Sequence, residues 1–171
     1  MALPLFHYCM ISHFMKALFL SLMLFFSGAC FAQLKVYKNN SGYQSDILFN
    51  LSGDKLYKKT SSYDSDVVCN IRGNKIFKEN SSYQSDVLFT ISDGKVYRGN
   101  SSYASDVVFQ IIDGHIYRGN STYRSDIIAN IRDGKVYSGN SSYSSDVLFT
   151  LSEMFTIEEF VAVWYAVKYV F

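Results

Sequence analysis

The chain has 171 residues, a net charge of +1 at pH 7, and 14 Tyr and 14 Phe against a single Pro. This length suits one domain with a sizeable core, and the near-neutral charge gives no electrostatic reason to expect binding to nucleic acid or to an anionic membrane. The many aromatic residues and the scarcity of proline are typical of short β-strands and argue against a disordered or linker-rich chain.

The first 32 residues have the order of a secretory signal peptide. Met15-Lys16 precedes an apolar run over residues 17–26, and small residues lead up to Ala32. We therefore predict that residues 15–32 are a signal peptide cleaved after Ala32 and that residues 1–14 are an upstream extension. The mature protein is then secreted, periplasmic or held at the cell envelope.

The cysteines and the short apolar run bear on two other possibilities for the N-terminal segment, a lipid anchor and a membrane span. Lipid attachment at Cys30 is the weaker alternative to cleavage after Ala32. The apolar run is short for a bilayer, so we expect no transmembrane span in the mature chain. Loss of the leader leaves Cys69 as the only cysteine, so the mature chain has no intramolecular disulfide. Since Cys69 stands where most copies have Phe, we expect a buried apolar role for it rather than a reactive thiol.

Residues 33–152 contain six copies of a 20-residue repeat in one register without an insertion. One tyrosine recurs as Tyr43, Tyr63, Tyr83, Tyr103, Tyr123 and Tyr143. An aspartate follows each of these as Asp46, Asp66, Asp86, Asp106, Asp126 and Asp146. Such a period indicates a repeat fold in which each unit buries its apolar face against its neighbours.

Each copy is predicted to form a β-hairpin. Val87, Phe89 and Ile91 alternate with other residues, which predicts a strand with these three side chains on one side. Leu88 and Thr90 are then expected on the other side. A second strand follows over residues 95–98.

Tight turns join the two strands of a hairpin. Asp-Gly pairs at residues 93–94, 113–114 and 133–134 favour a two-residue turn with positive φ at both positions. Gly53-Asp54 and Gly73-Asn74 also suit a primed turn. The turn at 93–94 pairs Ile91 with Val96. The linkers between hairpins are turn-forming residues around the recurring tyrosine, which we expect to wedge between neighbouring hairpins.

The two ends of the array are complementary. The chain begins the repeat with a lone second-type strand at residues 35–38 and ends it with a lone first-type strand at residues 147–151. Their pairing would close a ring and remove exposed edges, whereas an open solenoid would need atypical terminal caps. We therefore predict an all-β repeat fold, a closed ring of about six β-hairpin units with a buried C-terminal α-helix.

Residues 153–171 leave the repeat and predict that helix. Thr156 and Glu159 have the spacing of a capping box. The following residues are apolar around nearly the whole helix but too few to cross a bilayer, which favours burial in protein. A ring of twelve strands leaves a lumen wider than side chains can fill. We therefore expect the helix to fill or cap the ring, with Phe160 and Trp164 against several hairpins.

The chain resembles the five-fold β-flower family of small, secreted bacterial proteins of unknown function. The resemblance rests on Val96-Tyr97, on Ser101-Ser102-Tyr103, on the run from Ser105 to Phe109, and on the tail from Ile157 to Val167. It covers residues 33–171 and implies a flower-shaped repeat without implying an activity. Because the sequence has six copies, either the ring is six-fold or one copy does not form a regular unit.

Two sets of repeated side chains are candidate sites. The six tyrosines, with the Asn and Ser residues around them, would form a multivalent binding surface for glycans, and the alternative is that they are packing wedges. The six aspartates would form a calcium site if they converged, and the alternative is that each one caps a turn. Basic residues beside the second strands indicate either a basic rim or edge protection. They are Lys35, Lys38, Lys55, Lys58, Lys59, Lys75, Lys78, Arg98 and Arg118.

No motif of an enzyme stands out in the mature chain. His115 is its only histidine, and no zinc spacing, phosphate loop or dinucleotide fingerprint occurs. We therefore expect a non-enzymatic binding or scaffold module at the cell envelope, without a cofactor, whose partner is a glycan or an envelope protein. A lectin-like protein is the first alternative, and a hydrolase that uses paired carboxylates is the second.

Overall fold

The computed structural model describes residues 33–171, which lie within one compact unit. The predicted signal peptide, the upstream extension, the cleavage point and Cys30 lie outside these residues and stay predictions. The strands are β1 (Leu34–Lys38), β2 (Ile47–Ser52), β3 (Lys55–Lys58), β4 (Val67–Arg72), β5 (Lys75–Lys78), β6 (Val87–Ser92), β7 (Lys95–Arg98), β8 (Val107–Ile112), β9 (His115–Arg118), β10 (Ile127–Arg132), β11 (Lys135–Ser138) and β12 (Val147–Leu151). Single-turn 3-10 helices are η1 (Gln44–Asp46), η2 (Asp64–Asp66), η3 (Gln84–Asp86), η4 (Ala104–Asp106), η5 (Arg124–Asp126) and η6 (Ser144–Asp146). The α-helix α2 spans Ile157–Tyr169.

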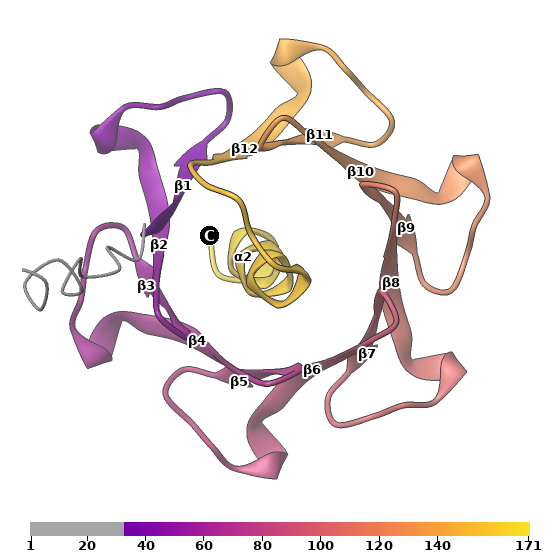
Figure 1. The fold of residues 1–171 in the computed structure, drawn as a ribbon, viewed down its shortest axis with the longest axis horizontal. Helices are drawn as coiled ribbons and strands as arrows, with labels where there is room; N and C mark the ends of the chain where they lie inside the picture. Colours follow the sequence, from indigo (N-terminus) through magenta and orange to yellow (C-terminus); the bar gives the residue numbers. More distant parts are fainter. Residues whose placement is uncertain (1–32) are drawn as a thin grey trace, which may run out of the picture. The chain divides into compact units, whose positions relative to one another are not determined.

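All twelve strands join in one closed antiparallel sheet, as Figure 1 shows. Going around it from β1, the order is β12, β11 and so on down to β2, which returns to β1. At the joint of β1 with β12, Lys38 lies opposite Phe149, as Lys58 lies opposite Phe49 in a hairpin that has a covalent turn. The joint is therefore a sixth hairpin made from the two ends of the array, and the predicted ring is confirmed with six units.

Hydrogen bonds replace the missing turn at this joint. The backbone N–H of Ser152 donates to the carbonyl of Lys35 at 3.0 Å, and the Lys35 N–H donates to the Ser152 hydroxyl at 2.9 Å. Further along, the Thr150 hydroxyl donates to the carbonyl of Asn39 at 2.8 Å. The joint thus has no free strand edge at either side.

The hairpin turns have the predicted conformations. Asp93 and Gly94 both have positive φ, 51° and 75°, and Ile91 pairs with Val96. At Gly53-Asp54 only the glycine has positive φ, 62°, as in a type II′ turn. Glycine is also needed at position 94 for space, because a Cβ there would lie 2.9 Å from the carbonyl oxygen of Ile111 on the next strand.

The predicted alternation along the first strand is wrong at one place in each copy. A β-bulge in the pairing of β5 with β6 leaves Leu88 without a partner opposite it. Leu88 therefore packs against the central core together with Phe89, whereas Val87 is buried outside that core. Hydrophobicity could not reveal the bulge because Val87 and Leu88 are both apolar.

The helix α2 lies inside the ring (Figure 1). Its capping box is present: the Glu159 N–H donates to the Thr156 hydroxyl at 3.2 Å, and the Thr156 N–H donates to the Glu159 carboxylate at 2.7 Å. Phe160 and Trp164 each lie 6.4 Å from Phe149, measured between ring centroids, and both are buried. The predicted plug is confirmed. Within residues 33–171, no helix has the length and apolar character that crossing a membrane requires.

The wall of the ring, which is the closed sheet of twelve strands, loses its repeated inward Phe at two positions, and contacts with the helix account for both. The inward Phe of each copy is replaced by Cys69 and by Ala129, which are three units apart and therefore lie on opposite sides of a six-unit ring. Cys69 lies against the helix backbone, with its Sγ 3.9 Å from the carbonyl oxygen of Ala162. The small Cys69 side chain thus makes room for the helix itself.

The second replacement makes room for helix side chains. Trp164 contacts Phe109 at 6.1 Å and Phe149 at 6.4 Å, and these two flank Ala129 in the ring. Since successive helix residues are about 100° apart, Ala162 lies on nearly the opposite side of α2 from Phe160 and Trp164. The helix therefore turns a small side toward Cys69 and a bulky side toward Ala129.

Candidate functional site

Six loops outside the ring carry the candidate site residues. We call them petals, and they are residues 39–46, 59–66, 79–86, 99–106, 119–126 and 139–146. Figure 1 shows them projecting away from the sheet around its whole circumference. Each petal leaves the ring where a short strand ends and returns where a long strand begins. We call this end of the ring the petal end and the end with the hairpin turns the turn end.

A serine and the recurring aspartate hold each petal closed. The Ser41 hydroxyl donates to the Asp46 carboxylate and accepts from the backbone N–H of Tyr43 at 3.2 Å. The Asp46 N–H donates to the Tyr43 carbonyl at 2.9 Å. The serine-aspartate bond recurs in all six petals. The aspartates therefore act within the turn, with a serine hydroxyl as the partner of the carboxylate.

A buried polar side chain fastens the petal to the outer face of the sheet. The Asn50 amide donates to the carbonyls of Lys59 and Ser61 at 2.7 and 3.0 Å, and Asn50 is only 1% exposed. Asn70 and Asn130 do the same in their units, and Thr90 and Gln110 make one such bond each. Because a buried amide is costly without partners, these bonds fix where each petal lies.

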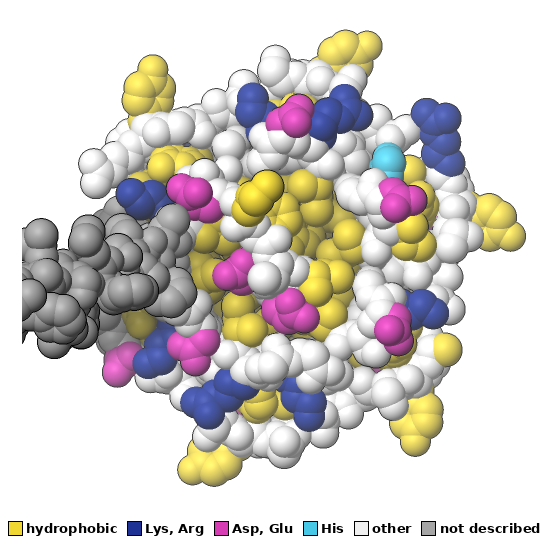
Figure 2. Space-filling view, in the orientation of Figure 1, with side chains coloured by type: hydrophobic (Ala, Val, Ile, Leu, Met, Phe, Trp, Pro, Cys, Tyr) yellow, Lys and Arg dark blue, Asp and Glu magenta, His cyan; other side chains and the backbone are white. Residues whose placement is uncertain are grey.

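The petal tyrosines are exposed, so the prediction that they wedge between hairpins is wrong. Their exposed fractions run from 73% to 76%, and Figure 2 shows hydrophobic side chains standing out from the rim of the molecule. The fold uses the tyrosine backbone in the petal hydrogen bonds rather than its ring. The tyrosines are Tyr43, Tyr63, Tyr83, Tyr103, Tyr123 and Tyr143. The structure thus arranges them as six separate, equivalent, outward-facing aromatic side chains.

The aspartates do not converge on a common site. Each of Asp46, Asp66, Asp86, Asp106, Asp126 and Asp146 belongs to a separate petal and binds the serine of that petal. Over residues 33–171, no three or more His, Cys, Asp or Glu side chains are grouped so that they could hold a metal ion. The geometry therefore does not bring these six aspartates together into a shared calcium site.

The basic residues form two groups rather than one rim. Lys55 and Lys75 begin their strands at the turn end, and Lys35 is the second residue of β1 there. Lys38 and Lys58 end their strands at the petal end. Lys55 reaches the Asp64 carboxylate at 2.9 Å. Because the sheet is closed, none of these residues protects a strand edge.

Cys69 and His115 show no sign of a catalytic arrangement. Burial raises the pKa of the Cys69 thiol to about 12, from an ordinary value of 9.0, so the side chain is a protonated, inert thiol at neutral pH. His115 lies at the turn end with its Nδ1 3.2 Å from the carbonyl oxygen of Asp113. Cys69 fills space beside the helix, as expected from the sequence.

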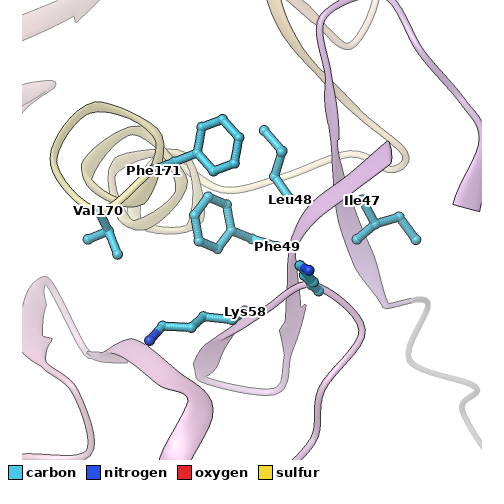
Figure 3. Close-up of a pocket in the computed structure, with 7 residues that line it drawn as sticks. Ile47, Leu48, Phe49, Lys58, Val170 and Phe171 are labelled. Carbon is cyan, nitrogen blue, oxygen red and sulfur yellow. The ribbon is translucent and has the colours of Figure 1, made fainter. Parts of the chain in front are cut away.

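Sequence reasoning missed a cavity at the petal end of the lumen. It has a volume of about 170 Å³ and lies between the last residues of the chain and unit β2–β3. Figure 3 shows Leu48 and Phe49 pointing toward Phe171, Ile47 pointing away, and Lys58 beside the opening. The signal available in the sequence was the register of the hairpins, which places Lys58 on the same face as Phe49.

Comparison with known proteins gives one match. A family model described as "6-fold beta flower protein" matches residues 29–112 and 105–167. These segments include every strand of the ring and most of α2. The resemblance to a flower fold is confirmed, while its five-fold count is corrected to six, in agreement with the twelve strands. Searches of curated proteins and of solved structures found no match.

Proposed function

The chain belongs to the 6-fold β-flower family, and from that premise we propose that it is a non-enzymatic binding or scaffold module of the cell envelope. The signal-like order of residues 15–32 supports the envelope location. The contact surface in this proposal is the tyrosine ring, defined as the six exposed petal tyrosines. Its ligands are glycans of the envelope, bound weakly by each petal and strongly by several petals together.

One observation carries the proposal: the tyrosine recurs in every petal although the fold does not use its ring. The serine and the aspartate of each petal recur for a visible reason, because they bind each other. The residue after the tyrosine is also exposed but differs between petals, as Gln44, Asp64, Gln84, Ala104, Arg124 and Ser144. Exposure alone therefore does not dictate a tyrosine, and a surface role accounts for it.

The chemistry of the petal suits a sugar ligand. A tyrosine ring combines an apolar face with a polar hydroxyl and is a rigid group, so ordering it on binding costs little entropy. Asn100 and Ser102 are exposed in the same petal as Tyr103 and offer amide and hydroxyl groups. Six such sites on one rigid ring provide the geometry for multivalent binding.

The test is binding to insoluble peptidoglycan and to envelope polysaccharide. We expect replacement of all six tyrosines by alanine to abolish retention of the protein, and replacement by phenylalanine to weaken it partly. The matched control replaces the six residues after the tyrosines by alanine and should bind normally. Unchanged retention of the all-alanine variant would refute the tyrosine ring as the contact surface.

A shift in melting temperature provides a second readout. A ligand that binds only the folded state raises the midpoint of thermal unfolding. We expect a rise with one class of glycan and no rise with the all-alanine variant. No shift with any glycan, together with a protein captured by crosslinking, would instead favour a scaffold role.

A further inference from the structure

Five cations encircle the petal end of the lumen. In each unit, the last residue of the short strand lies directly opposite the inward position of the long strand, so its side chain leaves from the lumen face of the sheet. These residues are Lys38, Lys58, Lys78, Arg98, Arg118 and Ser138. All six are exposed. We call the five basic members the cation ring.

The cation ring surrounds an apolar centre made by the end of the chain. Tyr169, Val170 and Phe171 are 66%, 43% and 73% exposed. Phe171 reaches Phe49 with 6.5 Å between ring centroids. Apart from this contact, water covers most of the surface of Tyr169 and Phe171 and a large part of that of Val170.

Two cavities join the centre to the cation ring. One, of about 170 Å³, is lined by Phe49, Lys58 and Phe171 among others. The other, of about 270 Å³, is lined by Phe89, Arg98 and Tyr169 among others. In both cavities a cation stands at the border of an apolar recess. This is the arrangement of charge and apolar surface in a site for an anionic amphiphile.

Neighbouring carboxylates leave most of this charge unpaired. Within residues 33–171, Lys78 is the only member of the cation ring with a carboxylate within 4.0 Å, that of Glu79 at 3.9 Å. Lys168 adds a further cation on the helix and lies 5.1 Å from the centroid of the Trp164 ring. The turn end differs, because both acidic and basic side chains lie around it in Figure 2. The net charge of +1 hides this separation.

We propose that the petal end docks on an anionic lipid surface. The cation ring contacts the phosphate groups of the lipids, while Tyr169, Val170 and Phe171 enter the boundary between headgroups and acyl chains. Charge and apolar area act together in such docking, and each alone binds weakly. The net charge of the chain alone gives no electrostatic reason to expect this docking. The docking does not depend on the tyrosine ring.

A soluble anion does not explain the same features. Inorganic phosphate or a simple polyanion would use the cation ring but gain nothing from an exposed Val170 and Phe171. A neutral lipid surface would use the apolar centre but not the five cations around it. Only a surface with both properties matches the whole petal end.

The experiment is cosedimentation of the purified protein with vesicles. Vesicles of phosphatidylcholine with about a third phosphatidylglycerol are compared with pure phosphatidylcholine. The test variant replaces Lys38, Lys58, Arg98 and Arg118 by glutamine. The matched control replaces Lys35, Lys75, Lys95 and Lys135 at the turn end by glutamine and changes the net charge equally.

We expect the protein to bind the anionic vesicles only and to release them as salt is raised. The petal-end variant should bind roughly tenfold more weakly or worse, since each cation near an anionic surface contributes substantially, and the turn-end variant should bind normally. No binding by the parent protein, equal binding to both vesicles, or equal loss in both variants would overturn the proposal.

A second pair of variants separates a lipid surface from a polyanion. Val170→Ser with Phe171→Ser removes apolar area at the petal end, and Met154→Ser removes an exposed apolar side chain, 98% exposed, at the turn end. We expect several-fold weaker vesicle binding for the first variant and no change for the second. Full binding by the first variant would assign the cation ring to a simple polyanion. The all-alanine variant of the tyrosine ring should still bind vesicles. Failure of the glycan proposal and failure of the lipid proposal can therefore be told apart.

Discussion

The wall of the ring and the helix inside it are built in opposite ways. The wall repeats one 20-residue unit six times, while α2 occurs once and has no symmetry. A helix with one small side and one bulky side cannot contact six identical units equally. The inward Phe of the repeat is therefore lost at Cys69 and Ala129, where the helix needs room.

Removal of the helix should have the largest effect on the stability of the fold. Without residues 156–171 the inward Phe, Val and Ile side chains of six units face an empty or flooded lumen, and their burial is lost. We expect an insoluble product or one without a cooperative thermal transition, measured by circular dichroism. A monomeric truncation that melts cooperatively would show that the wall is stable alone.

The stability lost on removing one inward phenylalanine should depend on which helix side chains pack against it. Phe149 is fully buried and contacts both Phe160 and Trp164, so Phe149→Ala should lower the free energy of unfolding by about 3–5 kcal/mol. Phe89 is 8% exposed beside an open cavity, so Phe89→Ala should cost less. Urea unfolding of both variants measures the difference. Equal losses would mean that the helix does not break the symmetry of the core energetically.

Restoring the repeat at Ala129 should destabilise the protein. Phe at this position meets the space that Trp164 occupies between Phe109 and Phe149, and overpacking of this kind costs about 1–3 kcal/mol. Combined with Trp164→Leu, the same substitution should cost less than the sum of the two single changes. An Ala129→Phe variant as stable as the parent would contradict the account of the wall.

The smallest expected effect is a loss of stability at high pH that comes from Cys69. Burial raises the pKa of Cys69 to about 12 in the folded state against 9.0 ordinarily. The unfolded chain therefore releases this proton first, and the contribution of Cys69 to stability is complete below pH 9 and lost as the pH rises to 12. At pH 10 the loss amounts to about 1 kcal/mol.

The measurement compares urea midpoints at pH 8 and pH 10. Because tyrosines ordinarily titrate in this range as well, the control is Cys69→Ala, which removes the thiol and leaves every tyrosine in place. The parent protein should lose more stability between the two pH values than this variant. Parallel losses would place the thiol in contact with water.

The sequence predicted the ring better than the site. Period, turn residues and complementary ends were enough for six hairpins, their closure and the plug, because each depends on local spacing. The bulge at Leu88 was not predictable, since a one-residue irregularity between two apolar residues leaves no trace in hydrophobicity. The exposure of Tyr43 and its equivalents was missed because an aromatic residue in a linker favours burial as readily as recognition. The cation ring was missed because the basic residues were interpreted as one rim, although the hairpin register already separates those that begin the short strands from those that end them.

The joint between β1 and β12 has a consequence for assembly. Every other strand pair joins segments within one 20-residue period of each other, whereas this seam joins the first strand to the last. A chain leaving the ribosome can thus build its hairpins early but cannot finish the circle until β12 exists. If the seam opens in a crowded solution, β12 of one molecule presents the edge that β1 of another molecule needs, and we expect exchanged dimers or chains of linked flowers.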